Sequence, residues 1–107
     1  MLTLKQLQKE QKEWSARNFP NNEPWMPLLG VQEEVGELSH SFLKRAQGIR
    51  GTDEQHYIDM VDAVGDIMVY LSDFCSRSDI DFQEALEKTW GTVKKRDWQK
   101  NKKDGSV

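Results

Sequence analysis

The sequence predicts an all-α fold of four helices in a single domain spanning residues 1–107. All of its periodic apolar segments have the three-to-four-residue spacing of an α-helix. No segment alternates between apolar and polar residues in the way that a half-buried strand requires. Two segments begin with helix-capping patterns, Thr52-x-x-Gln55 and Asp81-x-x-Glu84.

The first expected helix runs from about residue 3 to residue 16, and an irregular stretch follows it. Residues 18–27 hold all three prolines and a pair of asparagines, which forbid regular structure there. Such a long loop in so small a domain often lines a functional site.

The second expected helix runs from about Pro27 to Gly48, because proline suits a first turn and glycine suits a helix end. Glu34 lies beside its apolar stripe on the helical wheel, and Glu37 lies further round. The expected core stripe of this helix consists of Leu28, Val31, Val35, Leu38, Phe42 and Ala46.

The third expected helix begins after the turn at residues 48–51 and runs to about Cys75. The fourth continues from Asp81 to about Trp98, with Gly91 as a weak point. Residues 1–2 and about 102–107 are expected to fray. Four helices from one small chain leave apolar faces uncovered, so we expect a symmetric homodimer or homotetramer.

The third helix carries acidic residues on one narrow stripe although it is apolar around most of its circumference. Burying neighbouring carboxylates is costly unless a cation neutralises them. The alternative is that the stripe is the solvated face of an amphipathic helix. The stripe consists of Asp59, Asp62, Asp66 and Asp73.

A second acidic cluster, Glu33, Glu34 and Glu37, lies in the preceding helix. Residues three and four apart share one helical face, so these carboxylates point in one direction. Two such faces together predict a site for hard divalent cations, which prefer oxygen ligands.

The amino-acid composition excludes several classes of function for this protein. A formal net charge of −3 argues against a general binder of nucleic-acid polymers. The apolar runs are too short to cross a membrane and the first residues do not form a signal peptide, so we expect no membrane partner and a cytoplasmic location. The lone Cys75 excludes a disulfide within the chain and a thiolate zinc site, and we expect it in the core.

The segment Leu28-Leu-Gly-Val-Gln-Glu-Glu-Val-Gly-Glu-Leu, followed by Val61-Asp-Ala-Val-Gly-Asp-Ile-Met-Val-Tyr70, resembles the MazG-like nucleotide pyrophosphohydrolases of the all-α NTP pyrophosphatase superfamily. Their signature is EExxE followed after a spacer by ExxD. The resemblance spans nearly the whole chain and implies a bundle-like MazG-type fold. It also implies Mg²⁺-dependent hydrolysis of a nucleoside triphosphate to the monophosphate and pyrophosphate, a house-cleaning role in the nucleotide pool.

Within this resemblance, Glu34 and Glu37 match the metal-binding pair of the first motif, and Asp66 matches the final Asp of the second. Ala63 stands where the family has Glu. Asp62 is a fair geometric substitute because it lies within about 40° of Asp66 on the helical wheel. We therefore expect Glu34, Glu37, Asp62 and Asp66 to bind Mg²⁺, with Mn²⁺ as an alternative ion.

Glu33 is our candidate general base, because a carboxylate near a metal-bound water can take its proton; a solvated Glu33 is the alternative. Lys95 and Arg96 belong to a basic cluster at the end of the fourth helix. They are expected to hold the departing phosphates, unless they are only a charged helix end stabilised by the helix dipole.

A nucleobase needs a flat partner, which Trp14, Phe19 and Trp25 offer, and Asn18 can hydrogen-bond a base edge. Simple packing is the alternative for Trp14. By the resemblance, Tyr70 touches the sugar and disfavours a ribose 2′-hydroxyl, which favours deoxynucleotides. As an alternative, Tyr70 is a core residue.

Two other functions compete with this interpretation. Glu37-x-x-His40 matches the ligand unit of di-iron carboxylate proteins, but the required second unit is missing and His56 lacks the spacing. A non-catalytic helical interaction protein is the other alternative, with Ala63 marking lost activity.

Overall fold

The structure is a computed structural model that describes residues 1–107, and it contains four helices and no strands. They are α1 (Leu4–Asn18), α2 (Trp25–Gln47), α3 (Asp53–Arg77) and α4 (Phe82–Val93). The predicted all-α class is confirmed. None of these helices combines the length and the apolar character that crossing a membrane requires.

Several helix ends follow the capping residues of the sequence, whereas α2 begins at Trp25, two residues before the expected Pro27, and has no side-chain cap. Thr52 and Asp81 accept hydrogen bonds from the backbone N–H groups of Gln55 and Glu84, as predicted. Gly48 ends α2 with a left-handed φ of 70°. The fourth helix ends at Val93, before the expected Trp98, because the N–H groups of Lys95 and Arg96 donate to carbonyls only three residues back and tighten the chain out of the α-helix. The Asp97 carboxylate then accepts from two following N–H groups and begins a separate turn.

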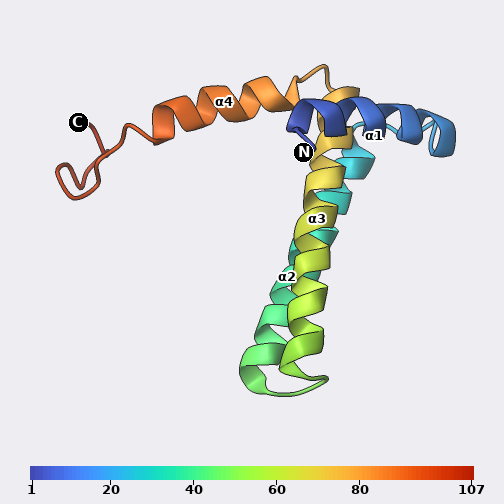
Figure 1. Ribbon diagram of the computed structural model, residues 1–107, viewed down its shortest axis with the longest axis horizontal. Coiled ribbons are helices and arrows are strands. Elements are labelled where there is room, and N and C mark those ends of the chain that lie inside the picture. Colours follow the sequence, from blue (N-terminus) through green and yellow to red (C-terminus); the bar gives the residue numbers. More distant parts are fainter.

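The helices form an open shape (Figure 1). Helices α2 and α3 make a long antiparallel hairpin, α1 crosses one end of this hairpin, and α4 leaves the same end in the opposite direction. The radius of gyration is 17.3 Å, whereas a compact domain of this length has about 13 Å. One chain therefore does not close into the expected bundle-like arrangement.

Helices α2 and α3 meet through small and polar residues. Ser41 and Ala63 are buried in this hairpin, and the Tyr70 ring lies so close to Gly30 that a Cβ there would be 2.4 Å from its Cε1. The expected core stripe is therefore wrong in part. Leu28, Val35 and Phe42 are 44, 42 and 62% exposed, because the close contact selects small side chains and turns these large ones outward.

The chain has little apolar core of its own. Ala63 and Cys75 are its buried hydrophobic side chains besides Pro27, so the expected burial of Cys75 is confirmed. Helix α4 contains no buried residue. At the far tip of the hairpin, the ring of His56 is hydrogen-bonded to the Ile49 carbonyl at 2.9 Å and fixes the turn.

The C-terminal segment folds back on itself, because the N–H group of Asp97 donates to the Gly105 carbonyl at 2.8 Å. Gly105 has a φ of 71° and lies against the Trp98 ring. Whether residues beyond about 102 fray stays a prediction.

Candidate active site

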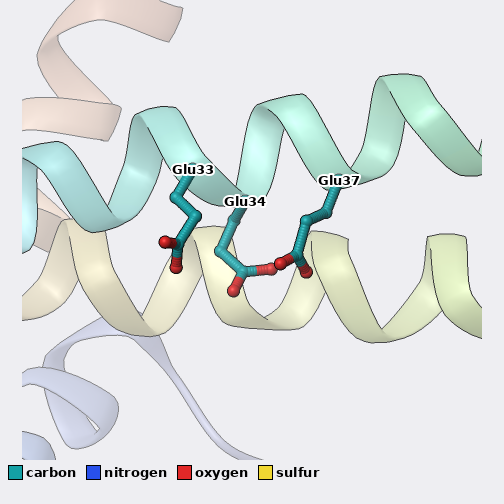
Figure 2. A group of neighbouring side chains, drawn as sticks. All are labelled: Glu33, Glu34 and Glu37. Atoms are coloured by element: carbon teal, nitrogen blue, oxygen red, sulfur yellow. The ribbon is translucent and has the colours of Figure 1, made fainter.

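Three carboxylates of α2 form a compact cluster. One oxygen from each of Glu33, Glu34 and Glu37 lies within 4.8 Å of the others. Figure 2 shows all three side chains extending from α2 towards α3. Glu34 is only 8% exposed, whereas the other two are exposed, so the cluster runs from the helix interface to solvent.

Helix α3 adds acidic charge to the same place. Burial raises the pKa of Glu34, and the charges of Glu37, Asp66, Glu33 and Asp62 raise it further, in that order. Burial likewise raises the pKa of Asp66, and the charge of Asp62 and a hydrogen bond to it contribute. The two acidic segments of the sequence therefore lie close enough to affect each other's ionisation.

Asp62 precedes Ala63, which stands where the MazG-like signature has Glu. Ala63 is buried in the helix contact, while Asp62 is exposed and interacts with both Asp66 and Glu34. The structure thus gives Asp62 the place beside Asp66 that the helical wheel predicts for it.

The donor set fits a hard divalent cation. The Oε2 atom of Glu34 is buried without a hydrogen-bond partner, and neither salt bridge of the chain involves a carboxylate of this cluster. Such unneutralised oxygens are the ligands that Mg²⁺ prefers. The cluster contains no histidine, and His40 is exposed, so the geometry adds nothing to the di-iron alternative.

A cavity of about 570 Å³ connects the acidic cluster to the predicted aromatic residues. Its lining includes Glu34 and Asp66 as well as Trp14 and Phe19. The two aromatic rings lie 5.7 Å apart with their planes at 64°, in edge-to-face contact. They form one apolar wall of the cavity rather than a parallel slot.

Tyr70 also lines the cavity, with its ring against the backbone of Gly30. Burial raises the pKa of its hydroxyl, and the charges of Glu33, Glu34, Asp66 and Glu37 raise it further. The phenol is therefore neutral at ordinary pH and lies within electrostatic reach of the acidic cluster.

Arg77 holds the aromatic side of the cavity in place. Its Nε donates to Asp73 Oδ1 at 2.9 Å, Nη1 donates to the Asn22 carbonyl at 2.6 Å, and Nη2 donates to Ser15 Oγ and the Phe19 carbonyl at 2.6 and 3.0 Å. This largely buried pair ties the end of α1 and the following loop to α3. Asp73, a member of the predicted acidic stripe, is thereby paired with Arg77.

Searches of family models, curated proteins and solved structures find no match to this chain. The cavity supplies carboxylates and an aromatic wall.

Two of the expected metal ligands, Glu37 and Asp62, do not line the cavity, and neither does Trp25.

Three other predicted site residues lie elsewhere. The Asn18 amide donates to the Trp14 carbonyl at 2.8 Å, and this residue does not line the cavity. Lys95 and Arg96 follow α4, which projects away from the hairpin (Figure 1), and they do not line the cavity either. Within one chain, no basic residue lines the cavity.

Sequence reasoning missed Gln11, Asn22 and Arg77. Gln11 and Asn22 line the cavity, and Arg77 fixes the loop that carries Phe19. The signals were present in part, because Gln11 precedes Trp14 by three residues and Arg77 follows Asp73 by four, which places each pair on one helical face.

Arg77→Lys is expected to lower the free energy of unfolding by about 2 kcal/mol, because an ammonium group cannot make the four contacts of the guanidinium at once. Denaturant unfolding followed by tryptophan fluorescence measures the loss. Arg17→Lys is the control, since Arg17 is exposed near the end of α1. Equal stabilities of the two variants would show that Arg77 does not hold the loop.

The raised pKa values of Glu34 and Asp66 predict how metal-free stability depends on pH. Both carboxyl groups take up a proton more readily in the folded state than in the unfolded state. Their protonation therefore contributes stability to the fold, which is fully present below the ordinary pKa values of 4.5 and 3.8. It is lost as the pH rises through the raised values. Mg²⁺ should therefore raise the melting temperature more at pH 7 than at pH 5.

Glu34→Gln should raise the melting temperature of the metal-free protein at pH 7 and remove most of the Mg²⁺ effect. Thermal melts with Mg²⁺ and with chelator measure both changes. Asp59→Asn is the control on α3, because Asp59 is exposed, lies outside the acidic cluster, and accepts a hydrogen bond on its carboxylate from the Gln55 side chain. An unchanged response to Mg²⁺ in Glu34→Gln would contradict the metal assignment.

Proposed function

We propose that this protein is a Mg²⁺-dependent nucleoside triphosphate pyrophosphohydrolase of the MazG-like type, acting in the cytoplasm to clear unwanted nucleotides. One observation carries the proposal: a single cavity contains both unneutralised carboxylates and an aromatic wall. A triphosphate with its metal suits the first feature, and a nucleobase suits the second.

Glu34, Glu37, Asp62 and Asp66 hold the metal in this proposal, with Mn²⁺ as an alternative to Mg²⁺. When bound, the ion supplies Lewis acidity towards phosphate oxygens and orients the attacking water. Glu33 belongs to the same cluster, is exposed, and takes the proton of that water on a carboxylate oxygen. The products are the nucleoside monophosphate and pyrophosphate.

Tyr70 faces the sugar in this arrangement. Its ring lies against Gly30, and it is within electrostatic reach of the acidic cluster while lining the cavity. A ribose 2′-hydroxyl packed on this ring would lose hydrogen bonds to water without a replacement. We therefore assign deoxynucleotides as the preferred substrates.

The proposed assembly rests on the two faces of the α2–α3 hairpin. One stripe of exposed apolar residues runs along α2. Each residue of this stripe comes directly after a residue that is buried against α3. The stripe consists of Leu28, Val35 and Phe42. The buried residues before them are Pro27, Glu34 and Ser41.

The same relation holds on α3, where the exposed Tyr57 and Val64 follow the buried His56 and Ala63. One residue turns a helix by about 100°, and the two helices are antiparallel. Both apolar stripes therefore lie on one face of the hairpin. Glu33 and Asp62 precede buried positions by one residue, so they lie on the opposite face.

A second copy of the chain covers the apolar face in our proposal and leaves the acidic face open to substrate. Large exposed apolar side chains on a single face are the usual mark of a protein interface. Helix α4 projects away from its own hairpin (Figure 1), so Lys95 and Arg96 do not serve the cavity of their own chain. In the proposed assembly they reach the cavity of another copy and bind the phosphates there.

Pyrophosphate release from a panel of nucleotides tests the activity. With Mg²⁺ we expect hydrolysis, faster for deoxynucleotides than for ribonucleotides, and none with chelator. Asp66→Asn should lower the rate at least about a hundredfold, because it removes a metal ligand. Asp59→Asn on the same helix should keep the wild-type rate. Equal rates with and without metal would refute the proposal.

Light scattering tests the assembly, and we expect two or four times the mass of one chain. Phe42→Asp places a charge on the apolar face and should shift the protein towards the monomer. Gln32→Asp, at an exposed polar position of the same helix, should leave the mass unchanged. A monomeric wild-type protein would exclude the second copy.

A further inference from the structure

The inner face of α1 carries three polar side chains, Gln8, Gln11 and Ser15. Gln8 uses both ends of its amide, donating to the Ile80 carbonyl at 2.8 Å and accepting from the Phe82 N–H at 2.9 Å. The Ser15 hydroxyl accepts from Arg77 at 2.6 Å. The side chains of these two residues therefore find hydrogen-bond partners within the protein.

Gln11 lies between them and is not satisfied. It is only 7% exposed, lines the cavity, and its Oε1 atom is buried without a hydrogen-bond partner. Buried polar atoms almost always have partners, because an unpaired one costs free energy that folding does not recover. An unpaired amide oxygen at a cavity wall therefore points to a partner that enters the cavity.

The neighbours of Gln11 indicate what that partner is. Trp14 lies one turn further along α1, and its ring meets Phe19 in the apolar wall. Such a wall stacks any flat ring, since every nucleobase has an aromatic face, and so it cannot select among bases. A carboxamide offers an acceptor and a donor side by side, which is what pairing with a base edge requires.

We propose that Gln11 is the residue that selects the nucleobase. Its Oε1 accepts a hydrogen bond from an N–H group on the edge of a base stacked on the aromatic wall, and its Nε2 donates to the adjacent ring nitrogen or carbonyl. This role deepens the proposed function and rests on it for the identity of the ligand.

Binding of the four deoxynucleosides, followed by quenching of tryptophan fluorescence, tests this role. Nucleosides carry no phosphate and need no metal, so the measurement does not depend on hydrolysis. Wild-type protein should prefer one base. Gln11→Met, which keeps the length of the side chain without its hydrogen bonds, should weaken binding of that base about tenfold and bring the four affinities close together.

Thermal melting of the unliganded proteins separates selection from a structural role. Gln11→Met should melt no lower than wild type, because it removes an unpaired buried amide oxygen. Gln8→Met is the matched control: it should melt lower and keep the base preference. A Gln11→Met protein that melts lower and still prefers the same base would overturn the proposal.

Pyrophosphate release from the same proteins distinguishes this inference from the proposed function. If wild type hydrolyses nucleotides and Gln11→Met keeps the base preference, the role of Gln11 is refuted and the enzyme stands. If wild type hydrolyses nothing but Gln11→Met loses its preference among nucleosides, the enzyme is refuted and the role of Gln11 stands. Equal binding of all four nucleosides by wild type would refute the role of Gln11.

Discussion

The contact between Arg77 and Asp73 is the interaction on which the cavity depends. The guanidinium reaches Ser15, Phe19 and Asn22 from a single point on α3, so one side chain fixes both the end of α1 and the loop after it. A largely buried charge is tolerated there because every contact is a charge-assisted hydrogen bond. Without it, the aromatic wall would have no fixed distance from the carboxylates.

The acidic cluster is a second constraint, and it opposes folding. Glu34 is buried among like charges and its Oε2 atom has no partner, so the hairpin bears a desolvation cost that a bound cation would offset. Sites of this kind trade stability for function. The acidic residues gather on one face of the hairpin, together with the exposed Leu29, Ile58 and Val69, and the stripe of Leu28, Val35 and Phe42 lies on the other face.

Much of the fold could be predicted from the sequence, because local signals decide it. Thr52, Asp81 and Gly48 mark helix ends that the structure confirms. The grouping of Glu33, Glu34 and Glu37 follows from helical periodicity alone. The buried stripe of α2 could not be predicted, because a helical wheel shows which residues are apolar but not which face a neighbour covers. The contacts of Arg77 and the partnerless amide of Gln11 depend on helices brought together by tertiary packing, which no local pattern reveals.

The small residues between α2 and α3 fix the positions of the acidic residues that the two helices carry. Gly30 touches the Tyr70 ring, and Ser41 and Ala63 are buried in the hairpin. Sliding or rotating one helix would force a larger side chain into a gap that admits only a small one, so the register is sterically locked. The helices therefore cannot shift to move the buried Glu34 away from its acidic neighbours, and a captured proton or ion is what would lower the charge around it.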